Sequence, residues 1–123
     1  MQENKTIIKF PPSFLDLLNQ VFEIEKKAAQ MQEPNSIHRN IKKMKEIFEN
    51  IFSTDTENMA GLSYDNPINE PYNETRTDLE ASIAGSSVEN LVITEVIKPI
   101  IRYRKDGINM LVQKGVVVVE SKS

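Results

Sequence analysis

Residues 91–119 read LVITEVIKPIIRYRKDGINMLVQKGVVVV and define the class of the fold. The run Leu91–Ile97 is rich in β-branched residues and has the length of one strand. Pro99 cannot donate a ladder hydrogen bond, so we expect a strand end, an edge or a bulge at that position. Asp106-Gly107 lies between two further apolar runs and is a strong hairpin signal. The last third of the chain is therefore predicted to be antiparallel β-structure.

A run of four valines, Val116–Val119, follows the break at Gly115. Such a run in an exposed edge strand would promote aggregation. We therefore expect it to form an internal strand of a small sheet.

Upstream of residue 53 the apolar residues recur at helical spacing. Pro11-Pro12 should hold the chain extended, which makes Ser13 a candidate N-cap with Asp16 in the favourable first turn. Pro34 ends this first helix, and Asn35-Ser36 are placed to cap the next one. The apolar positions of the first helix are Phe14, Leu18, Val21, Phe22 and Ala28 or Ala29.

The second helix carries a single narrow apolar stripe in steps of four and three residues. Two amphipathic helices joined near Pro34 predict an antiparallel hairpin. Two short helices cannot cover both apolar faces by themselves. The surplus apolar surface must therefore pack on the second half of the chain or on another copy of the pair. The stripe consists of Ile37, Ile41, Met44, Phe48 and Ile51.

Residues 54–90 are rich in Asn, Ser, Thr, Asp, Gly and Pro and sparse in apolar residues. A disordered linker is one interpretation of this composition. Scattered apolar anchors favour an irregular but anchored segment, with turns at Asn66-Pro67 and Glu70-Pro71. The anchors are Tyr64, Ile68, Tyr72, Leu79 and Ile83.

The sequence thus predicts an α+β protein in three sections. Residues 1–53 form an antiparallel helical hairpin, residues 54–90 an irregular acidic connector, and residues 91–123 a small, mostly antiparallel β-domain.

The composition argues against catalysis and against a metal or other cofactor. The chain of 123 residues has no cysteine and one histidine, so thiol chemistry is excluded and transition-metal ligation is implausible. His38 lies off the apolar stripe, and no carboxylate or nucleophile is placed by sequence to converge on it. The acidic residues of the connector match no calcium loop. We expect a protein that is not an enzyme.

The charge and hydropathy patterns argue against nucleic-acid and membrane partners. The net charge is −3, and no sustained basic stripe offers a surface for phosphates, so we expect no nucleic-acid binding. No apolar run approaches a membrane span, and the polar N-terminus does not resemble a signal peptide. With no cysteine, the expected location is the cytoplasm.

Three segments resemble the GrpE family, the nucleotide-exchange factors of DnaK-type heat-shock chaperones. Asn69-Glu70-Pro71-Tyr72-Asn73 is similar to the family pattern G-x-P-(F/Y)-(D/N)-P. Leu111-Val112-Gln113-Lys114-Gly115 is similar to its V-x-Q-K-G turn. Residues 14–28, FLDLLNQVFEIEKKA, look like its first bundle helix. The chain departs from the family in two ways: only a short segment precedes the first helix in place of a long helical stalk, and the Asp106-Gly107 hairpin precedes the Q-K-G turn.

The resemblance implies a co-chaperone that favours an open, low-ADP-affinity state of a DnaK-type chaperone by contact alone. The implied contact face of the β-domain lies near Pro99, Met110 and Val112, with Gln113 and Lys114 of the Q-K-G turn. It also implies a homodimer in which two helix pairs form a four-helix bundle through the stripe Ile37, Ile41, Met44, Phe48 and Ile51. The alternative is a non-enzymatic adaptor that uses the same scaffold to bind a different protein or a peptide strand.

Overall fold

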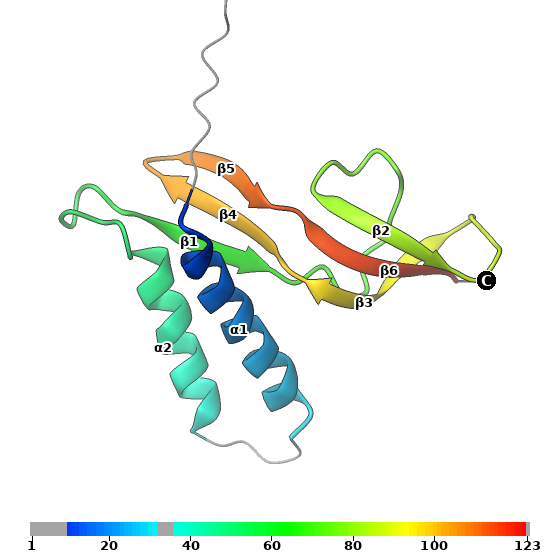
Figure 1. Ribbon diagram of the computed structural model, residues 1–123, viewed down its shortest axis with the longest axis horizontal. Helices are drawn as coiled ribbons and strands as arrows, with labels where there is room; N and C mark the ends of the chain where they lie inside the picture. The colour runs from blue at the N-terminus through cyan, green and yellow to red at the C-terminus, as the bar shows by residue number, and fades with distance from the viewer. Residues whose placement is uncertain (1–9, 32–35, 123) are drawn as a thin grey trace, which may run out of the picture.

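The computed structural model describes residues 10–31 and 36–122, and it has the α+β class expected from the sequence. A helical hairpin precedes a β-domain, which extends sideways from the top of the helices (Figure 1). The helices are α1 (Pro12–Ala29) and α2 (Ile37–Glu49). The strands are β1 (Ala60–Asp65), β2 (Leu79–Ala84), β3 (Leu91–Lys98), β4 (Ile100–Lys105), β5 (Ile108–Gln113) and β6 (Gly115–Ser121).

The start of α1 differs from the expectation by one residue. The helix begins at Pro12, the N-cap position is Pro11, and no side chain caps it. Ser13 therefore lies inside the first turn, and the prediction that it is the N-cap was wrong. Proline presets the helical φ and lacks the N–H that a cap would satisfy, so Pro12 itself opens the helix. The predicted stop at Pro34 and the predicted capping residue Asn35 lie outside the described residues. Ser36 stands at the N-cap position of α2 but makes no side-chain capping bond.

A long antiparallel ribbon runs through the whole β-domain. β3 and β4 are separated by Pro99, and β5 and β6 by Lys114, so each pair continues in nearly one direction (Figure 1). β4 pairs with β5 and β3 pairs with β6. The turn between the two arms is Asp106-Gly107, with φ of 48° and 82°, as a two-residue hairpin requires. The predicted hairpin and the predicted break at Pro99 are both confirmed.

One further strand joins each end of the ribbon and makes two three-stranded sheets. β1 adds antiparallel to β4, which gives the order β1-β4-β5. β2 adds parallel to β6, which gives the order β2-β6-β3. The valine strand β6 is thus internal, as expected, and its Val117 and Val119 are fully buried.

The segment 54–90 is less irregular than the sequence analysis expected. It contributes β1 and β2, and residues 69–72 run along the outer edge of β3. There Ile93 N–H donates to the Glu70 carbonyl and Tyr72 N–H donates to the Leu91 carbonyl, both at 2.9 Å. The "connector" is therefore an integral part of both sheets. Its strands lack the β-branched pattern of 91–119, and they are extended because they pair with β4 and β6.

The helix pair packs on the sheet β1-β4-β5. The shared core joins apolar side chains of both helices to those of β1 and β4: Leu18, Phe22, Ile41, Phe48, Leu62 and Ile101. The C-terminal end of α2 lies directly against β1 at Gly61. A Cβ there would collide with the Phe48 and Glu49 carbonyl oxygens. Only glycine permits this approach.

Candidate functional site: the protein-binding surfaces

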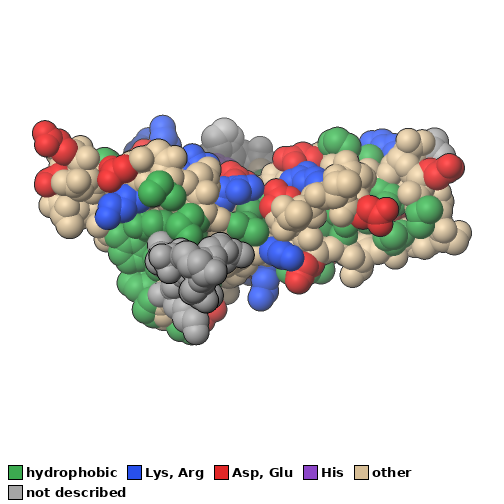
Figure 2. Space-filling model, turned by 90° about the horizontal axis from the view of Figure 1, so that it is seen from above, with side chains coloured by type: hydrophobic (Ala, Val, Ile, Leu, Met, Phe, Trp, Pro, Cys, Tyr) green, Lys and Arg blue, Asp and Glu red, His purple; other side chains and the backbone are tan. Residues whose placement is uncertain are grey.

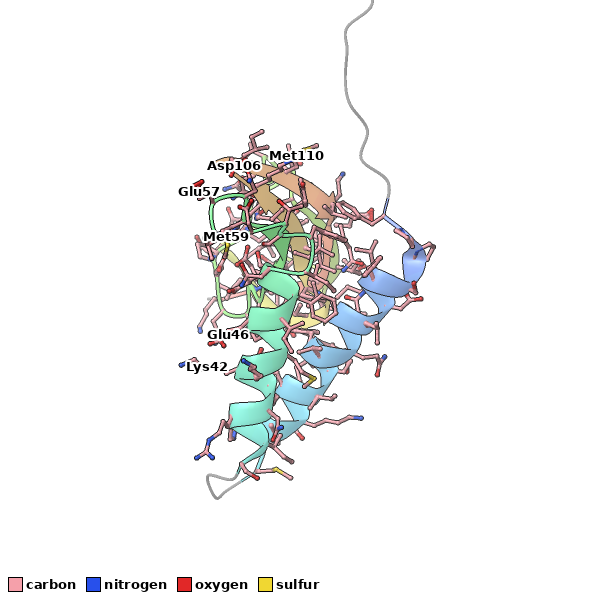
Figure 3. All side chains as sticks on the ribbon, turned by 90° about the vertical axis from the view of Figure 1, so that its left-hand side faces the viewer. Lys42, Glu46, Glu57, Met59, Asp106 and Met110 are labelled. Atoms are coloured by element: carbon pink, nitrogen blue, oxygen red, sulfur yellow. The ribbon has the colours of Figure 1, made fainter. Side chains whose placement is uncertain are left out.

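The described part of the chain contains no group of three or more His, Asp or Glu side chains that could hold a metal ion. His38 lies exposed on α2, in a hollow of about 400 Å³. Lys42 and Glu46 lie beside it and point outward from α2 (Figure 3). The residues that line the hollow are Glu25, His38, Ile41, Lys42, Lys45, Glu46 and Glu49, and no hydroxyl group is among them. This hollow thus offers no hydroxyl or thiol nucleophile for His38 to activate.

Two of the predicted partner-binding residues have internal roles. Pro99 is fully buried at the junction of β3 and β4. Gln113 forms a reciprocal amide pair with Asn19 of α1, in which each side chain donates to the other at 3.0 Å. Gln113 Nε2 also donates to the Pro99 carbonyl at 2.9 Å. These bonds fix α1 against the ribbon at the point where the two sheets meet.

The other three predicted residues are more accessible. Met110 and Val112 are partly buried on β5, and Lys114 is exposed between β5 and β6. Met110 lies close to the Asp106 turn and far from Lys42 and Glu46 of α2 (Figure 3). The five residues therefore follow one strand and its junction and do not form one compact patch. Their role in binding a partner stays a prediction.

The predicted dimer stripe on α2 is largely used inside one chain. Ile41 and Phe48 are buried in the core, where α1 lies alongside, and Met44 and Ile51 are partly buried. Ile37, at the start of the helix, is 38% exposed. Ile41 and Phe48 cannot meet a second copy unless the hairpin opens.

A different face of the helix pair carries exposed apolar side chains. Leu17, Ile24 and Ile47 are 57%, 41% and 52% exposed. Each lies two residues, or about 200° around the helix, from a side chain that touches the sheet. The sheet contacts are Asn19 to Gln113, Lys26 Nζ to the Val96 carbonyl, and Lys45 Nζ over the Tyr64 ring. We call Leu17, Ile24 and Ile47 the outer helix face, since it points away from the sheet.

On the face seen in Figure 2, hydrophobic side chains form a continuous area at the end of the molecule that carries the helices. The outer helix face was not predicted from the sequence, although Leu17 and Ile24 are seven residues apart and thus nearly in line along α1. The stronger inner stripe concealed this second signal.

An ion-pair network lies where the two sheets meet. Arg76 makes two hydrogen bonds to the Asp78 carboxylate, at 3.0 and 3.1 Å, and one to Glu70 at 3.0 Å. Arg102 of β4 bonds both Asp78, at 3.3 Å, and Asp65 of β1, at 3.2 Å. The Arg76 guanidinium lowers the pKa of Asp78 below its usual range. The network ties the segment before β2 to β1 and β4.

A second polar cluster lies between the helices and β1. Tyr64 donates its phenol O–H to Glu25 at 2.6 Å, and Lys45 Nζ lies 3.4 Å from the same carboxylate. Burial and the Glu25 carboxylate both raise the pKa of Tyr64. The phenol therefore stays protonated and serves as a donor that anchors α1 to the sheet.

An open pocket of about 310 Å³ separates the C-terminal half of α1 from β3. Phe22, Val96 and Ile68 form its apolar wall, and Glu25 and Glu95 lie on its rim. Lys26 spans it, with its ammonium group bonded to the Val96 carbonyl and 5.2 Å from the centre of the Phe22 ring. The Lys26 ammonium group, which a charged ligand in this pocket would need, is therefore already bonded within the chain.

The comparisons with known proteins identify no relative: no family model, no curated protein and no solved structure matches this chain. The GrpE-like motifs therefore stand on their residues alone.

In the described part of the chain, neither helix has the length and apolar character needed to cross a membrane.

Proposed function

We propose that the protein is a GrpE-like co-chaperone that promotes ADP release from a DnaK-type heat-shock chaperone by direct contact. The observation that carries this proposal is the position of Gln113, in the segment similar to the family's Q-K-G turn. Its side chain bonds both Asn19 of α1 and the carbonyl of Pro99. The motif thus couples the helix pair to the β-domain, which is what a protein acting as a rigid wedge requires.

The mechanism needs no catalytic group. The β-domain binds the open form of the chaperone's nucleotide-binding lobes more tightly than the closed form, and this difference shifts the population toward the open form. The long ribbon and the Asp78 network make the β-domain stiff, so binding energy is not lost in deforming it. We place this activity in the cytoplasm, in keeping with a chain that has no cysteine.

The test is release of a fluorescent ADP analogue from the chaperone, with and without a saturating concentration of this protein. Wild type should accelerate release, and Gln113→Ala should do so less, because the helix pair is no longer fixed to the β-domain. Gln20→Ala removes an exposed amide on α1 next to Asn19, the partner of Gln113; it serves as the matched control and should act like wild type. Failure of wild type to accelerate release or to capture the chaperone would refute the proposal.

The working form in this proposal is a homodimer whose helix pairs form a four-helix bundle. Leu17, Ile24 and Ile47 of the outer helix face form the interface, in place of the buried Ile41 and Phe48. α1 and α2 are roughly 27 and 20 Å long. The area that two helices of this length can bury side by side approaches the lower end of stable interfaces, about 600–800 Å² per partner.

Sedimentation equilibrium tests the dimer. Wild type should be dimeric, and the double variant Leu17→Glu/Ile47→Glu should be monomeric with an unchanged circular dichroism spectrum, because both side chains are exposed in one chain. Ile83→Glu, at a comparably exposed apolar residue on β2, is the control and should stay dimeric. A monomeric wild type, or a dimeric double variant, would contradict this arrangement.

The second candidate is an adaptor that binds another protein through the same scaffold. It is favoured by the position of the Asp106-Gly107 hairpin, which precedes the Q-K-G segment and places β5 at the margin of the molecule. Binding to another protein without any effect on ADP release would favour the adaptor.

A further inference from the structure

The outer edges of two strands are covered by other parts of the chain. The end of α2 lies against β1 at Gly61, and Phe52 N–H donates to the Ala60 carbonyl at 3.0 Å. Residues 69–72 pair along the first half of β3, and Lys26 Nζ occupies the Val96 carbonyl farther along. β1 and β3 are therefore closed to a further strand.

The edge of β5 is open. β5 lies at the end of the order β1-β4-β5, on the margin of the ribbon (Figure 1). Residues 108–112 make no backbone hydrogen bond to any described residue outside the β4–β5 ladder. Native edge strands are usually guarded by a charge, a proline or a bulge directed outward. β5, with the sequence INMLVQ, contains neither a charge nor a proline. Its one bulge, at Val112, lies at the far end of the strand, past Asn109 and Leu111.

The register shows which backbone groups are available. Lys105 and Ile108 flank the two-residue turn, so they form a hydrogen-bonded pair of the ladder. The pairs then alternate, which turns the N–H and C=O groups of Asn109 and Leu111 away from β4. These two residues present donors and acceptors at the spacing that an added strand requires.

The side chains at this edge are apolar in the middle and positive at both ends. Ile108 and Leu111 are 56% and 40% exposed. Arg104 and Lys105 lie at the turn end and Lys114 at the other, and none forms an ion pair with a described residue. Asp106 is the single negative charge in the sequence between Arg104 and Lys114. Glu49 of α2 also lines the hollow beside Lys105 and Ile108. Three positive charges against these two carboxylates leave the edge with a small positive balance on a chain whose net charge is −3.

We infer that the open edge of β5 binds an extended strand of a partner protein, with apolar residues at alternate positions and acidic residues at both ends. The partner strand pairs with Asn109 and Leu111 through its backbone, as in other cases of β-strand addition. Its acidic ends meet Lys105 and Lys114. The inference rests on the proposed function to the extent that the protein acts by binding another protein through its β-domain.

The competing edge is that of β2, the outermost strand of the order β2-β6-β3. β2 carries Glu80, and its Ile83 is 45% exposed. An acidic strand would be repelled there and attracted to β5, so the charge of the bound strand distinguishes the two edges.

A pair of fluorescein-labelled peptides, DVTVTVD and KVTVTVK, tests the inference by fluorescence anisotropy at low salt. The two share one apolar pattern and differ in the sign of their ends. DVTVTVD should bind, and the amide resonances of Asn109 and Leu111 should shift on its addition. Leu111→Glu should weaken binding about tenfold or more, because it adds a negative charge beside the acidic strand. Lys114→Glu should move the preference toward KVTVTVK.

Ile83→Glu is the matched control, since Ile83 is 45% exposed against 40% for Leu111 but lies on the edge of β2. It should leave binding of DVTVTVD unchanged. Three results would each overturn the inference. The first is equal binding of both peptides, and the second is an equal loss of binding in Ile83→Glu and Leu111→Glu. The third is self-association that Leu111→Glu abolishes, without any peptide binding. Peptide binding without accelerated ADP release would refute the exchange function alone and leave the β5 site in place.

Discussion

The two ends of the β-domain are built on the same ribbon but are covered differently. At the hairpin end, the sheet β1-β4-β5 packs on two helices and a cluster of rings. Phe22 contacts Tyr64, and Phe10 contacts Tyr103, with ring centres 5.6 and 5.3 Å apart. At the other end, no described helix packs across a face of the sheet β2-β6-β3, although Lys26 of α1 reaches the Val96 carbonyl of β3. The segment before β2 supplies the buried Pro67 and the partly buried Tyr72.

The difference shows how one β-ribbon can serve two purposes. The hairpin end has a thick core that fixes the helices. The other end has a thin layer, in which Val117 and Val119 are buried while Val116 and Val118 on the opposite face are partly exposed. The stability of this thin end therefore depends on the ion-pair network and on backbone pairing. Substitutions at the two ends should therefore have unequal effects.

The largest effect is expected from Phe22→Ala. Phe22 of α1 is fully buried against the sheet, where its ring meets Tyr64 of β1, so its loss should lower the free energy of unfolding by about 3–5 kcal/mol. Val117→Ala at the thin end should cost roughly 2 kcal/mol, since fewer methyl groups are removed. Urea unfolding of the two variants measures the difference. Equal losses would contradict the contrast between a thick and a thin core.

Gly61→Ala should rank next, at about 1–3 kcal/mol, because the added methyl group collides with carbonyl oxygens that cannot move without shifting α2. Gly85→Ala is a useful control with a different cause. Its Cβ meets open space, but φ is +88°, so only backbone strain is introduced. The near-ultraviolet circular dichroism of the ring cluster, followed during thermal melting, should therefore be weakened in Gly61→Ala and unchanged in Gly85→Ala.

A smaller effect, about 1 kcal/mol, is expected from Asp78→Asn, which removes the charge that joins Arg76 to Arg102. Because the pKa of Asp78 is lowered in the folded state, its ionised form stabilises the protein above the ordinary carboxyl pKa. That stabilisation is lost as the pH falls through the lowered value. Wild type should thus lose more stability than Asp78→Asn below about pH 5. Parallel acid-unfolding curves for the two proteins would show that the network does not stabilise the thin end.

The smallest effect is expected from Ile83→Thr on the edge of β2. The side chain is 45% exposed and the substitution keeps the β-branch, so stability should change by less than about 0.5 kcal/mol. Chemical denaturation is again the measurement. A loss above 1.4 kcal/mol, about tenfold in the unfolding equilibrium, would indicate that the outer edge of β2 contributes to the core.

The sequence predicted the parts of the fold in which pattern and pairing agree. The hairpin at Asp106-Gly107, the break at Pro99 and the internal valine strand each depend on local chemistry that tertiary packing did not alter. β1 and β2 were missed because AGLSYD and LEASIA have little intrinsic strand character, and pairing with β4 and β6 decides their conformation.

The candidate surfaces were harder to predict than the fold. Whether Ile41 faces its own chain or a second copy depends on where α1 lies, and a helical period alone does not give that position. The role of Gln113 depends on Asn19, far away in sequence, so no local motif reveals it. The outer helix face and the open edge of β5 were found only when the contacts of their neighbours were known.

The ribbon also has a consequence for the order in which the molecule assembles. The pairing of Lys105 with Ile108 closes a very short loop, whereas β1 and β2 must each reach a partner far along the chain. Short loops close at the lowest entropic cost. We therefore expect the Asp106-Gly107 hairpin to form early and zip toward Pro99, while β1 and β2 join later. In a folding experiment, substitutions at the turn should slow refolding, and those in β2 should mainly speed unfolding.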